Sequence, residues 1–256
     1  MAKKHLGQNF LFDPSILRRI LEASEICDND TVVEIGAGHG RLTDLLIQRA
    51  KKVLAIEIDE YFVKTLQQRY QNNEKVNIIH IDAMKYPYED LSEFKVVANI
   101  PYYITTPLLF RLLKARDKLR SMTITMQREV AERIVADNKK GDYGLLSVAV
   151  QYYGRAELKF IIPRGAFRPT PKVDSAVIKI DISPTSRIDV GDERVFFQVL
   201  KAGFGQRRKT LYNCLKPLNP HIKEILTNIG IDYMRRAETL SIDDFSKISR
   251  HLSMIK

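Results

Sequence analysis

The sequence has no tryptophan, only two cysteines and only five histidines among its 256 residues. Cys27 and Cys214 lie far apart without C-x-x-C spacing, so we expect reduced thiols rather than a disulfide framework. The histidines form no ligand cluster, which argues against a metal site. No apolar run approaches the ~20 residues of a membrane span, and the N-terminus carries neither an export signal nor a presequence. These absences favour a cytoplasmic protein without a membrane or metal role.

What the sequence does contain is apolar residues for a core and an excess of positive charge. Hydrophobic residues make up 45% of the chain, and the formal net charge is +10 with a pI near 9.5. The length suffices for one large and one small domain, and we expect a monomer. A basic balance favours a polyanionic partner, most often nucleic acid, although ordinary solubilising charge is the alternative.

Apolar runs alternate with helical patterns through the first half of the chain. The expected strands are 31–35, 53–58, 76–81, 95–98 and 122–126. The helical patterns start at 13–14 and after the glycines at 36–40, and then span 60–70 and 106–114. This alternation predicts a mostly parallel sheet wound on both faces. Two further strands, 158–162 and 176–182, have no helical pattern between them, so we expect this pair to be antiparallel.

The alternation stops near residue 185. The patterns that follow are helical, at 193–202, 210–215, 222–229 and 243–252. We therefore predict a doubly wound α/β domain over 1–185 and a small all-helical domain over 186–256. Within the first domain, helices are expected at 127–136 and from Leu145, with a polar loop at 137–142 between them.

Glycines and acids follow the first three expected strands. Gly36, Gly38 and Gly40 come directly after the first strand, where glycine lets the backbone turn tightly and a ligand approach. Glu57 ends the second strand, where a carboxylate can accept both hydroxyls of a ribose, and Asp82 follows the third, placed for an adenine amino group. The G-x-G-x-G spacing is not that of dinucleotide sites, so the set favours S-adenosylmethionine over NAD. Each part alone also fits a tight βα turn or a solvated acid.

The fourth strand runs into Asn99-Ile100-Pro101-Tyr102-Tyr103. A hydrogen-bond acceptor, a rigid turn and a flat ring are the parts needed to hold a planar base by its amino edge. The alternative interpretation is a proline turn with an exposed tyrosine pair. We expect Tyr102 to stack on a base and Tyr103 to serve only in packing.

Short motifs, each different, are found along nearly the whole chain. They are Gly7-Gln8-Asn9-Phe10-Leu11, the glycine turn with Leu42-Thr43, Ile56-Glu57-Ile58-Asp59, Asp82-Ala83, Asn99-Ile100-Pro101-Tyr102, Tyr143-Gly144-Leu145-Leu146-Ser147-Val148, Phe167-Arg168-Pro169-Thr170-Pro171-Lys172-Val173 with Ser175 and Val177, and Arg207-Arg208-Lys209-Thr210-Leu211. With these motifs the chain resembles the small-subunit ribosomal RNA adenine N6-dimethyltransferases of the KsgA type. The resemblance implies a class I (Rossmann-like) methyltransferase fold. The expected cofactor contacts are Gln8, Asn9, Leu11, Gly36, Gly38, Glu57, Ile58, Asp82, Ala83 and Asn99.

The chemistry expected at this site needs no strong base. An exocyclic adenine amine is a poor nucleophile because its lone pair is delocalised into the ring. Accepting its N–H groups at the Asn99 side-chain oxygen and the Ile100 carbonyl would help to localise the lone pair and aim it at the methyl donor. Pro101 would fix the turn, Tyr102 would stack on the base, and Phe167, in an exposed Phe-x-Pro-x-Pro loop, would cover its other face. The alternative for Phe167 is a core aromatic residue before a proline turn.

The resemblance names the substrate as two adjacent adenines in the 3′-terminal hairpin of small-subunit rRNA, each dimethylated. The rivals are a large-subunit rRNA or DNA adenine methyltransferase and a non-catalytic ribosome assembly factor. Basic residues are expected to contact the RNA, with Arg120 beside the first two of those given below, and with Lys139 and Lys140 framing the site. The expected contacts are Arg116, Lys118, Arg168, Lys172, Arg207, Arg208 and Lys209.

Overall fold

A computed structural model describes residues 8–138, 143–183, 185, 188–206 and 208–254. The chain divides into two compact units, the first formed by 1–131 and 155–184 and the second by 132–154 and 185–256. This division differs from the predicted boundary at 185, because residues 132–154 belong to the same unit as the C-terminal helices. The reason is local packing, since the helix at 145–153 is buried on most of its sides and contacts two later helices. The predicted polar loop lies partly outside the described residues.

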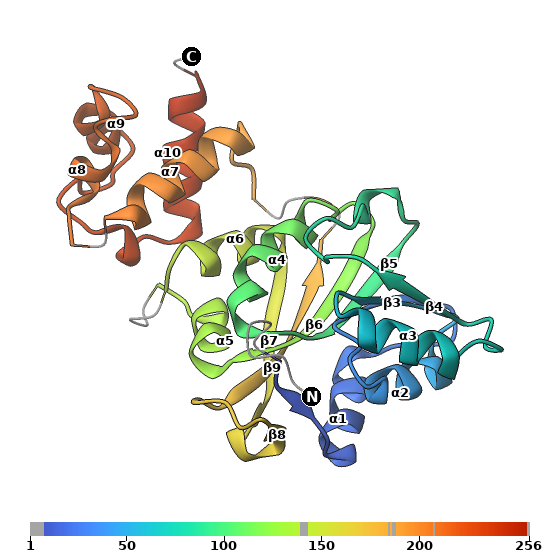
Figure 1. The fold of residues 1–256 in the computed structure, drawn as a ribbon. Helices are drawn as coiled ribbons and strands as arrows, with labels where there is room; N and C mark the ends of the chain where they lie inside the picture. Colours follow the sequence, from blue (N-terminus) through green and yellow to red (C-terminus); the bar gives the residue numbers. More distant parts are fainter. Residues whose placement is uncertain (1–7, 139–142, 184, 186–187, 207, 255–256) are drawn as a thin grey trace. The chain divides into compact units, whose positions relative to one another are not determined.

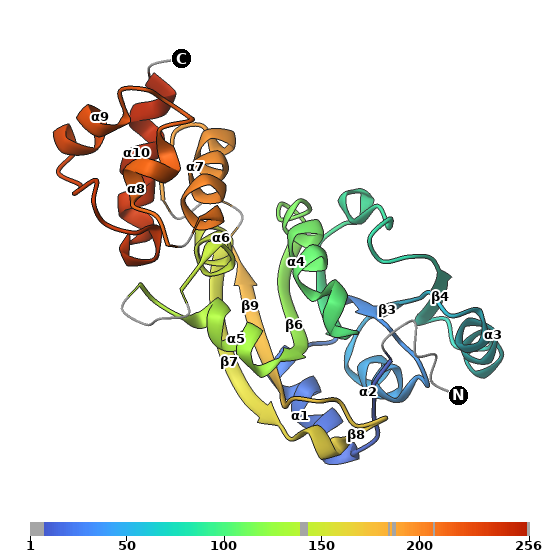
Figure 2. The same ribbon diagram turned by 60° about the vertical axis from the view of Figure 1, so that its left-hand side comes forward.

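The first unit is built on a seven-stranded sheet in the order β4-β3-β2-β5-β6-β9-β7 (Figure 1). Its strands are β2 (Thr31–Ile35), β3 (Lys52–Glu57), β4 (Val76–His80), β5 (Phe94–Asn99), β6 (Leu119–Gln127), β7 (Gly154–Ile162) and β9 (Ser175–Ile182). Strands β2 to β6 pair in parallel, and β9 is antiparallel to β6. The arrows of β7 and β9 run in opposite directions in Figure 2. The predicted mostly parallel, doubly wound sheet with an antiparallel last strand is confirmed.

Helices precede, connect or follow the parallel strands, and three of them are crossovers of the kind that the alternation predicted. They are α1 (Pro14–Ser24), α2 (Arg41–Arg49), α3 (Glu60–Arg69), α4 (Thr105–Leu113) and α5 (Arg128–Val135), with short 3-10 turns η2 (Tyr88–Asp90), η3 (Tyr102–Ile104) and η4 (Arg164–Ala166). Aspartate side chains cap the N-termini of two of these helices. Asp13 accepts from the Ser15 amide at 2.8 Å ahead of α1, and Asp59 accepts from the Tyr61 amide at 3.1 Å ahead of α3.

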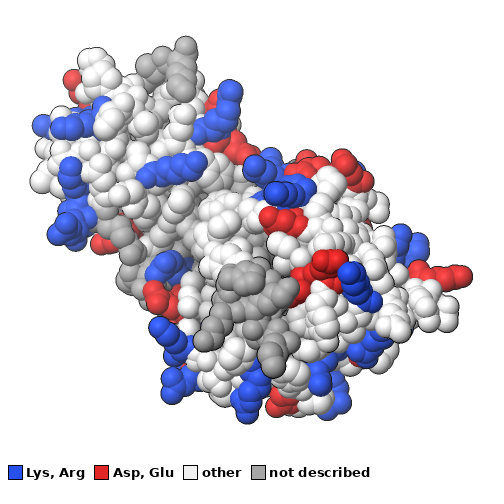
Figure 3. Space-filling model, in the orientation of Figure 1, with Lys and Arg blue, Asp and Glu red and all other residues white. Residues whose placement is uncertain are grey.

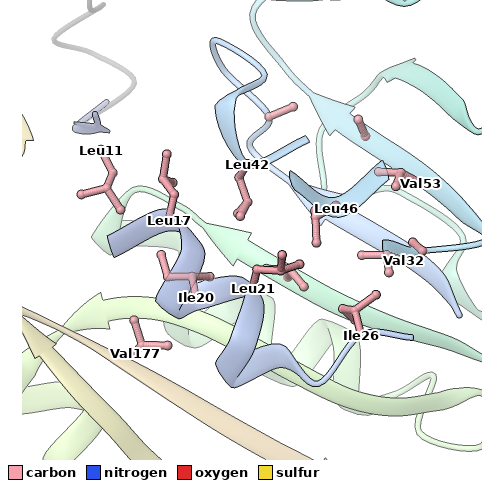
Figure 4. Close-up of a cluster of buried hydrophobic side chains, with 14 of the residues drawn as sticks. Leu11, Leu17, Ile20, Leu21, Ile26, Val32, Leu42, Leu46, Val53 and Val177 are labelled. Carbon is pink, nitrogen blue, oxygen red and sulfur yellow. The ribbon is translucent and has the colours of Figure 1, made fainter. Parts of the chain in front are cut away.

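A hydrophobic core holds α1 and α2 against one face of the sheet (Figure 4). Leu17, Ile20 and Leu21 of α1 are buried because their spacing places them on one side of the helix. They pack with Leu46 of α2 and with side chains of β2, β3 and β9. This core fixes the carboxyl ends of β2 and β3 relative to the helix that precedes them, and so gives the loops at those ends a rigid base.

A second, two-stranded sheet was not expected from the sequence. Strand β1 (Phe10–Leu11) pairs antiparallel with β8 (Phe167–Arg168), so that Phe10 lies opposite Arg168 and Leu11 opposite Phe167. Leu11 is buried in the same core cluster as Leu17. The pairing joins the start of the chain to the loop that precedes β9.

The second unit is helical in its described residues. It contains α6 (Leu145–Tyr153), α7 (Glu193–Gly205), α8 (Leu211–Leu215), α9 (Ile222–Asn228) and α10 (Ile242–Met254), with the 3-10 turn η5 (Ala237–Thr239). Tyr153 stacks on Phe197 at 5.8 Å, and its hydroxyl donates to Glu193 at 2.7 Å, which fastens α6 to α7. None of the described helices is long and apolar enough to cross a membrane.

Candidate functional site

A cavity of about 250 Å³ opens at the carboxyl ends of the parallel strands. It lies where the chain order of the sheet reverses, between β2 and β5, which is where open α/β sheets bind ligands. The residues that line it come from the N-terminal segment, the glycine loop and the ends of β3, β4 and β5. All ten predicted cofactor residues are among them, namely Gln8, Asn9, Leu11, Gly36, Gly38, Glu57, Ile58, Asp82, Ala83 and Asn99.

The glycine loop fits closely against the end of β5. Gly36 has φ +79°, a left-handed conformation that side chains disfavour, and its amide donates to the Ile56 carbonyl at 2.9 Å. A Cβ on Gly36 would lie 3.4 Å from the Asn99 carbonyl oxygen. Glycine at this position therefore lets the loop and the Asn99 turn approach each other across the cavity.

Glu57 anchors the loop from the neighbouring strand. One carboxylate oxygen accepts from the Gly38 amide at 2.8 Å, and the other accepts from the amides of Ile58 at 2.8 Å and Asp59 at 2.9 Å. The side chain is only 5% exposed. A carboxylate oxygen has two lone pairs, so the Gly38-bonded oxygen can also accept from a ligand hydroxyl.

The N-terminal segment borders the cavity beside the glycine loop. The Phe10 ring contacts the His39 ring at 4.8 Å and the Phe62 ring at 5.4 Å, and a Cβ on Gly38 would lie 3.1 Å from it. The Gln8 amide group donates to Asp59 at 3.4 Å. The sequence motif included Phe10 but did not reveal its contact with His39, because aromatic contacts between distant segments leave no local pattern.

The ends of β3 and β4 supply two further walls. Asp82 accepts from the Met84 amide at 2.9 Å, which shapes the turn that holds the adjacent, buried Ala83. Ile58 lines the cavity yet is 50% exposed. An apolar side chain at the rim, beside an acid, suits the flat face and polar edge of a nucleobase.

Residues 99–103, the Asn99 turn, lie partly at the cavity and partly beside it. Asn99, Pro101 and Tyr103 line the cavity, and Tyr103 is 62% exposed, so the expectation that Tyr103 only packs is wrong. Tyr102 is half-buried, and its hydroxyl hydrogen-bonds to the Ser175 hydroxyl at 2.7 Å. Burial raises the pKa of Tyr102, which stays neutral at physiological pH.

Phe167 does not lie in an exposed loop. Its side chain is 1% exposed and belongs to the core cluster with Leu11 and Val177. Pairing in the β1–β8 sheet turns this ring inward, while the neighbouring Arg168 stays exposed. The predicted exposure of Phe167 is wrong, and in this conformation its ring does not offer a face to a base.

Sequence reasoning also missed Glu34, a buried acid at the cavity wall. It is 1% exposed and accepts from the Thr43 hydroxyl at 2.6 Å. Burial, with a smaller contribution from the nearby Glu57 charge, raises the pKa of Glu34 to about 8. The only sequence signal is an acid inside an apolar strand just ahead of the glycines. Among the described residues, no group of three His, Cys, Asp or Glu side chains could hold a metal ion.

The raised pKa of Glu34 predicts a pH-dependent free energy of unfolding. The folded protein keeps a proton that the unfolded chain releases from pH 4.5 upward, so this contribution is full below pH 4.5 and is lost as the pH rises to about 8. Urea unfolding across this range should show a smaller decline for Glu34→Gln than for the wild type. Glu22→Gln, at an exposed position of α1, is the control. Equal declines in all three proteins would contradict the assignment.

The predicted RNA contacts lie in three places. Arg168 and Lys172 are exposed on β8 and its following loop, and Lys and Arg atoms gather along the lower margin of Figure 3, where Figure 1 shows β8 and α1. Arg116 and Lys118 precede β6 and so lie at the amino ends of the strands, whereas the cavity lies at their carboxyl ends. In the second unit, Arg208 and Lys209 are exposed, whereas residue 207 lies outside the described part.

The chain is similar to known proteins over nearly its whole length. The family model described as ribosomal RNA adenine dimethylase matches residues 1–253. A ribosomal RNA small subunit methyltransferase A from Clostridium botulinum (strain Loch Maree / Type A3) is 46% identical over 254 residues, covering 96% of this chain and 92% of the relative. A protein of the same name from Geobacillus thermodenitrificans is 44% identical over 265 residues, covering 98% and 90%.

Two solved structures have the same fold. A dimethyladenosine transferase from Plasmodium falciparum superposes with a TM-score of 0.81 at 28% identity, covering 93% of this chain and 95% of that one. The 23S rRNA methyltransferase ErmE superposes with a TM-score of 0.74 at 24% identity, covering 95% and 99%, and supports the fold alone.

Proposed function

The chain belongs to the ribosomal RNA adenine dimethylase family, and from this membership and the geometry of its cavity we propose the reaction that it carries out. It transfers methyl groups from S-adenosylmethionine to the exocyclic amines of two adjacent adenines in the 3′-terminal hairpin of small-subunit rRNA, giving dimethyladenosines during subunit biogenesis. One observation carries the proposal. The glycine loop, Glu57, Asp82 and the Asn99 turn all line a single cavity at the switch point of the sheet.

The residues of the cavity fit the parts of this cofactor. Glu57 would accept from a ribose hydroxyl, since its Gly38-bonded oxygen retains one lone pair. Asp82 would accept from the adenine amino group, with Ile58 against the base. When bound, the cofactor supplies an electrophilic methyl group on its sulfonium. Gln8, Asn9 and Leu11 would border it on the side of the N-terminal segment.

The acceptor amine would be held by the turn that ends β5. The Asn99 side-chain oxygen and the Ile100 carbonyl would accept its two N–H groups, and Pro101 keeps the backbone in a fixed extended conformation, φ −57° and ψ 138°. Catalysis then rests on orientation, which can lower a barrier by about 7–11 kcal/mol in favourable cases. The amine loses its proton after it has gained the methyl group, so no strong base is required.

A methylation assay tests the reaction and its substrate. Purified protein and labelled S-adenosylmethionine would be incubated with small-subunit particles that lack the modification, with naked large-subunit RNA and with duplex DNA. We expect dimethyladenosine only in the particles, at two adjacent positions. Labelled large-subunit RNA or DNA would favour the rival enzymes. Tight binding to the particles without any methyl transfer would favour an assembly factor.

Binding to the particles should depend steeply on salt. About six phosphate contacts would give a slope near −5 in a plot of log affinity against log salt concentration. Lys172→Gln should reduce the magnitude of this slope by about one, because Lys172 is exposed beside the β8 loop. Lys51→Gln, at an exposed position before β3, is the matched control and should leave the slope unchanged. A slope near zero for the wild type would exclude the predicted phosphate contacts.

A further inference from the structure

The hydroxyl of Tyr102 is tied to a residue that has no role in the reaction described above. Tyr102 begins the short turn η3, three residues after Asn99, and its ring is half-buried. Its hydroxyl lies 2.7 Å from that of Ser175, a hydrogen bond in which either group can donate. Ser175 is 0% exposed. A buried hydroxyl is costly unless it is paired, so this contact is strongly favoured in the folded state.

Ser175 is itself held in place by its neighbours. It is the first residue of β9 and lies opposite Gln127 of β6. The preceding Asp174 accepts from the Arg128 amide at 3.0 Å through its carbonyl and from the Arg164 amide at 2.9 Å through its side chain. The Ser175 hydroxyl is therefore a fixed point on the sheet, whereas Tyr102 lies in a short turn in which no residue is fully buried.

We propose that Ser175 is a positioning residue for methyl transfer, which holds the Tyr102 ring in the place from which it stacks on the acceptor adenine. This inference rests on the proposed function. The hydroxyl oxygen lies at the far end of the ring, on the axis of the Cβ–Cγ bond, so its hydrogen bond to Ser175 restrains the rotation about Cα–Cβ, which would swing the whole ring away. With the tether in place, the ring keeps one position relative to Asn99. Without it, the ring samples several positions, and part of the stacking is lost.

The matched pair of variants is Tyr102→Phe and Ser175→Ala. Each removes one hydroxyl of the same hydrogen bond, and Tyr102→Phe retains the ring. We expect each to lower kcat/KM for the particles by about two- to tenfold, as for the loss of one hydrogen bond. The loss should fall mainly on KM, because the chemical groups of the Asn99 turn are intact. The dissociation constant for S-adenosylmethionine, measured by calorimetry, should not change.

The double variant separates positioning from a structural role. If the two hydroxyls act through each other, Tyr102→Phe combined with Ser175→Ala should be no worse than either single variant. Losses that multiply would overturn the proposal, as would weakened cofactor binding in Ser175→Ala. Ser24→Ala is the control, since Ser24 is also a buried serine with one hydrogen bond, to the Leu21 carbonyl at 2.6 Å, and lies at the end of α1.

Two further outcomes are decisive. If Ser175→Ala does not fold, Tyr102→Phe alone still tests the tether, and wild-type activity in that variant would overturn the proposal. A wild-type protein that does not methylate the particles would instead overturn the proposed function, and this inference with it. A loss confined to the tethered pair in an active enzyme would support both.

Discussion

Asn99→Ala should reduce methyl transfer to the particles by about two to three orders of magnitude, the range observed when one transition-state hydrogen bond is removed. Asn99 ends β5 and lines the cavity next to Pro101. Its side-chain oxygen is the acceptor that would localise the amine lone pair. The residues that would hold the ribose and adenine are Glu57, at the end of β3, and Asp82, just after β4. Single-turnover rates, with cofactor binding measured in parallel, are the test.

Cofactor binding by Asn99→Ala should remain measurable, within about tenfold of the wild type, because Asn99 contributes only one of several contacts to the cavity. Asn77→Ala is the matched control, since Asn77 is an exposed asparagine within β4. It should leave both measurements unchanged. Full methyl transfer by Asn99→Ala would exclude the proposed mechanism. Complete loss of cofactor binding would show that Asn99 acts in binding rather than in orienting the amine.

Glu57→Ala should weaken S-adenosylmethionine binding by about 100-fold or more. The substitution removes the acceptor of the Gly38, Ile58 and Asp59 amides, and Asp59 is only 3% exposed. Leaving a buried donor unpaired costs about 1–3 kcal/mol, and the ribose contact is lost as well. The free energy of unfolding should therefore fall together with the affinity. Isothermal titration and urea unfolding measure the two effects.

Glu57→Gln separates the shape of the side chain from its charge. Glutamine keeps one acceptor oxygen but places an NH₂ group, a donor only, against backbone amides that are also donors. We expect affinity between that of the wild type and that of Glu57→Ala. Glu60→Gln, next to the same loop on the exposed start of α3, should bind the cofactor normally. Unchanged affinity in Glu57→Ala would remove Glu57 from the cofactor site.

The cavity was predictable because its residues follow strands with clear apolar patterns. The carboxyl ends of parallel strands meet at one edge of a sheet, so Gly36, Glu57, Asp82 and Asn99 had to converge once the strands were recognised. The orientation of each side chain was less accessible. Tyr103 lies in a short turn, and no sequence pattern specifies in which direction its side chain points. Only the structure showed that this side chain is exposed.

Pairing between distant segments was the part that sequence patterns could not reveal. A two-residue strand such as β1 has no periodicity, and its partner β8 lies in a proline-rich loop that reads as exposed. Phe167 was misplaced for that reason. The helix α6 was assigned to the wrong unit because an almost wholly apolar helix shows that it is buried but not which elements bury it.

The β1–β8 pairing bears on how many methyl groups are added per encounter with the RNA. Dimethylating an adenine consumes two cofactor molecules, so the spent cofactor must leave while the substrate is partly modified. The N-terminal segment that borders the cavity contains β1, so it cannot move away without breaking its pairing to β8 or moving β8 with it. One loop connects β8 to Ser175, whose hydroxyl is hydrogen-bonded to Tyr102. We therefore expect cofactor exchange past this segment to loosen the proposed stacking of Tyr102 on the adenine. The expected time course is distributive, with monomethylated adenine accumulating in free particles before the dimethylated product.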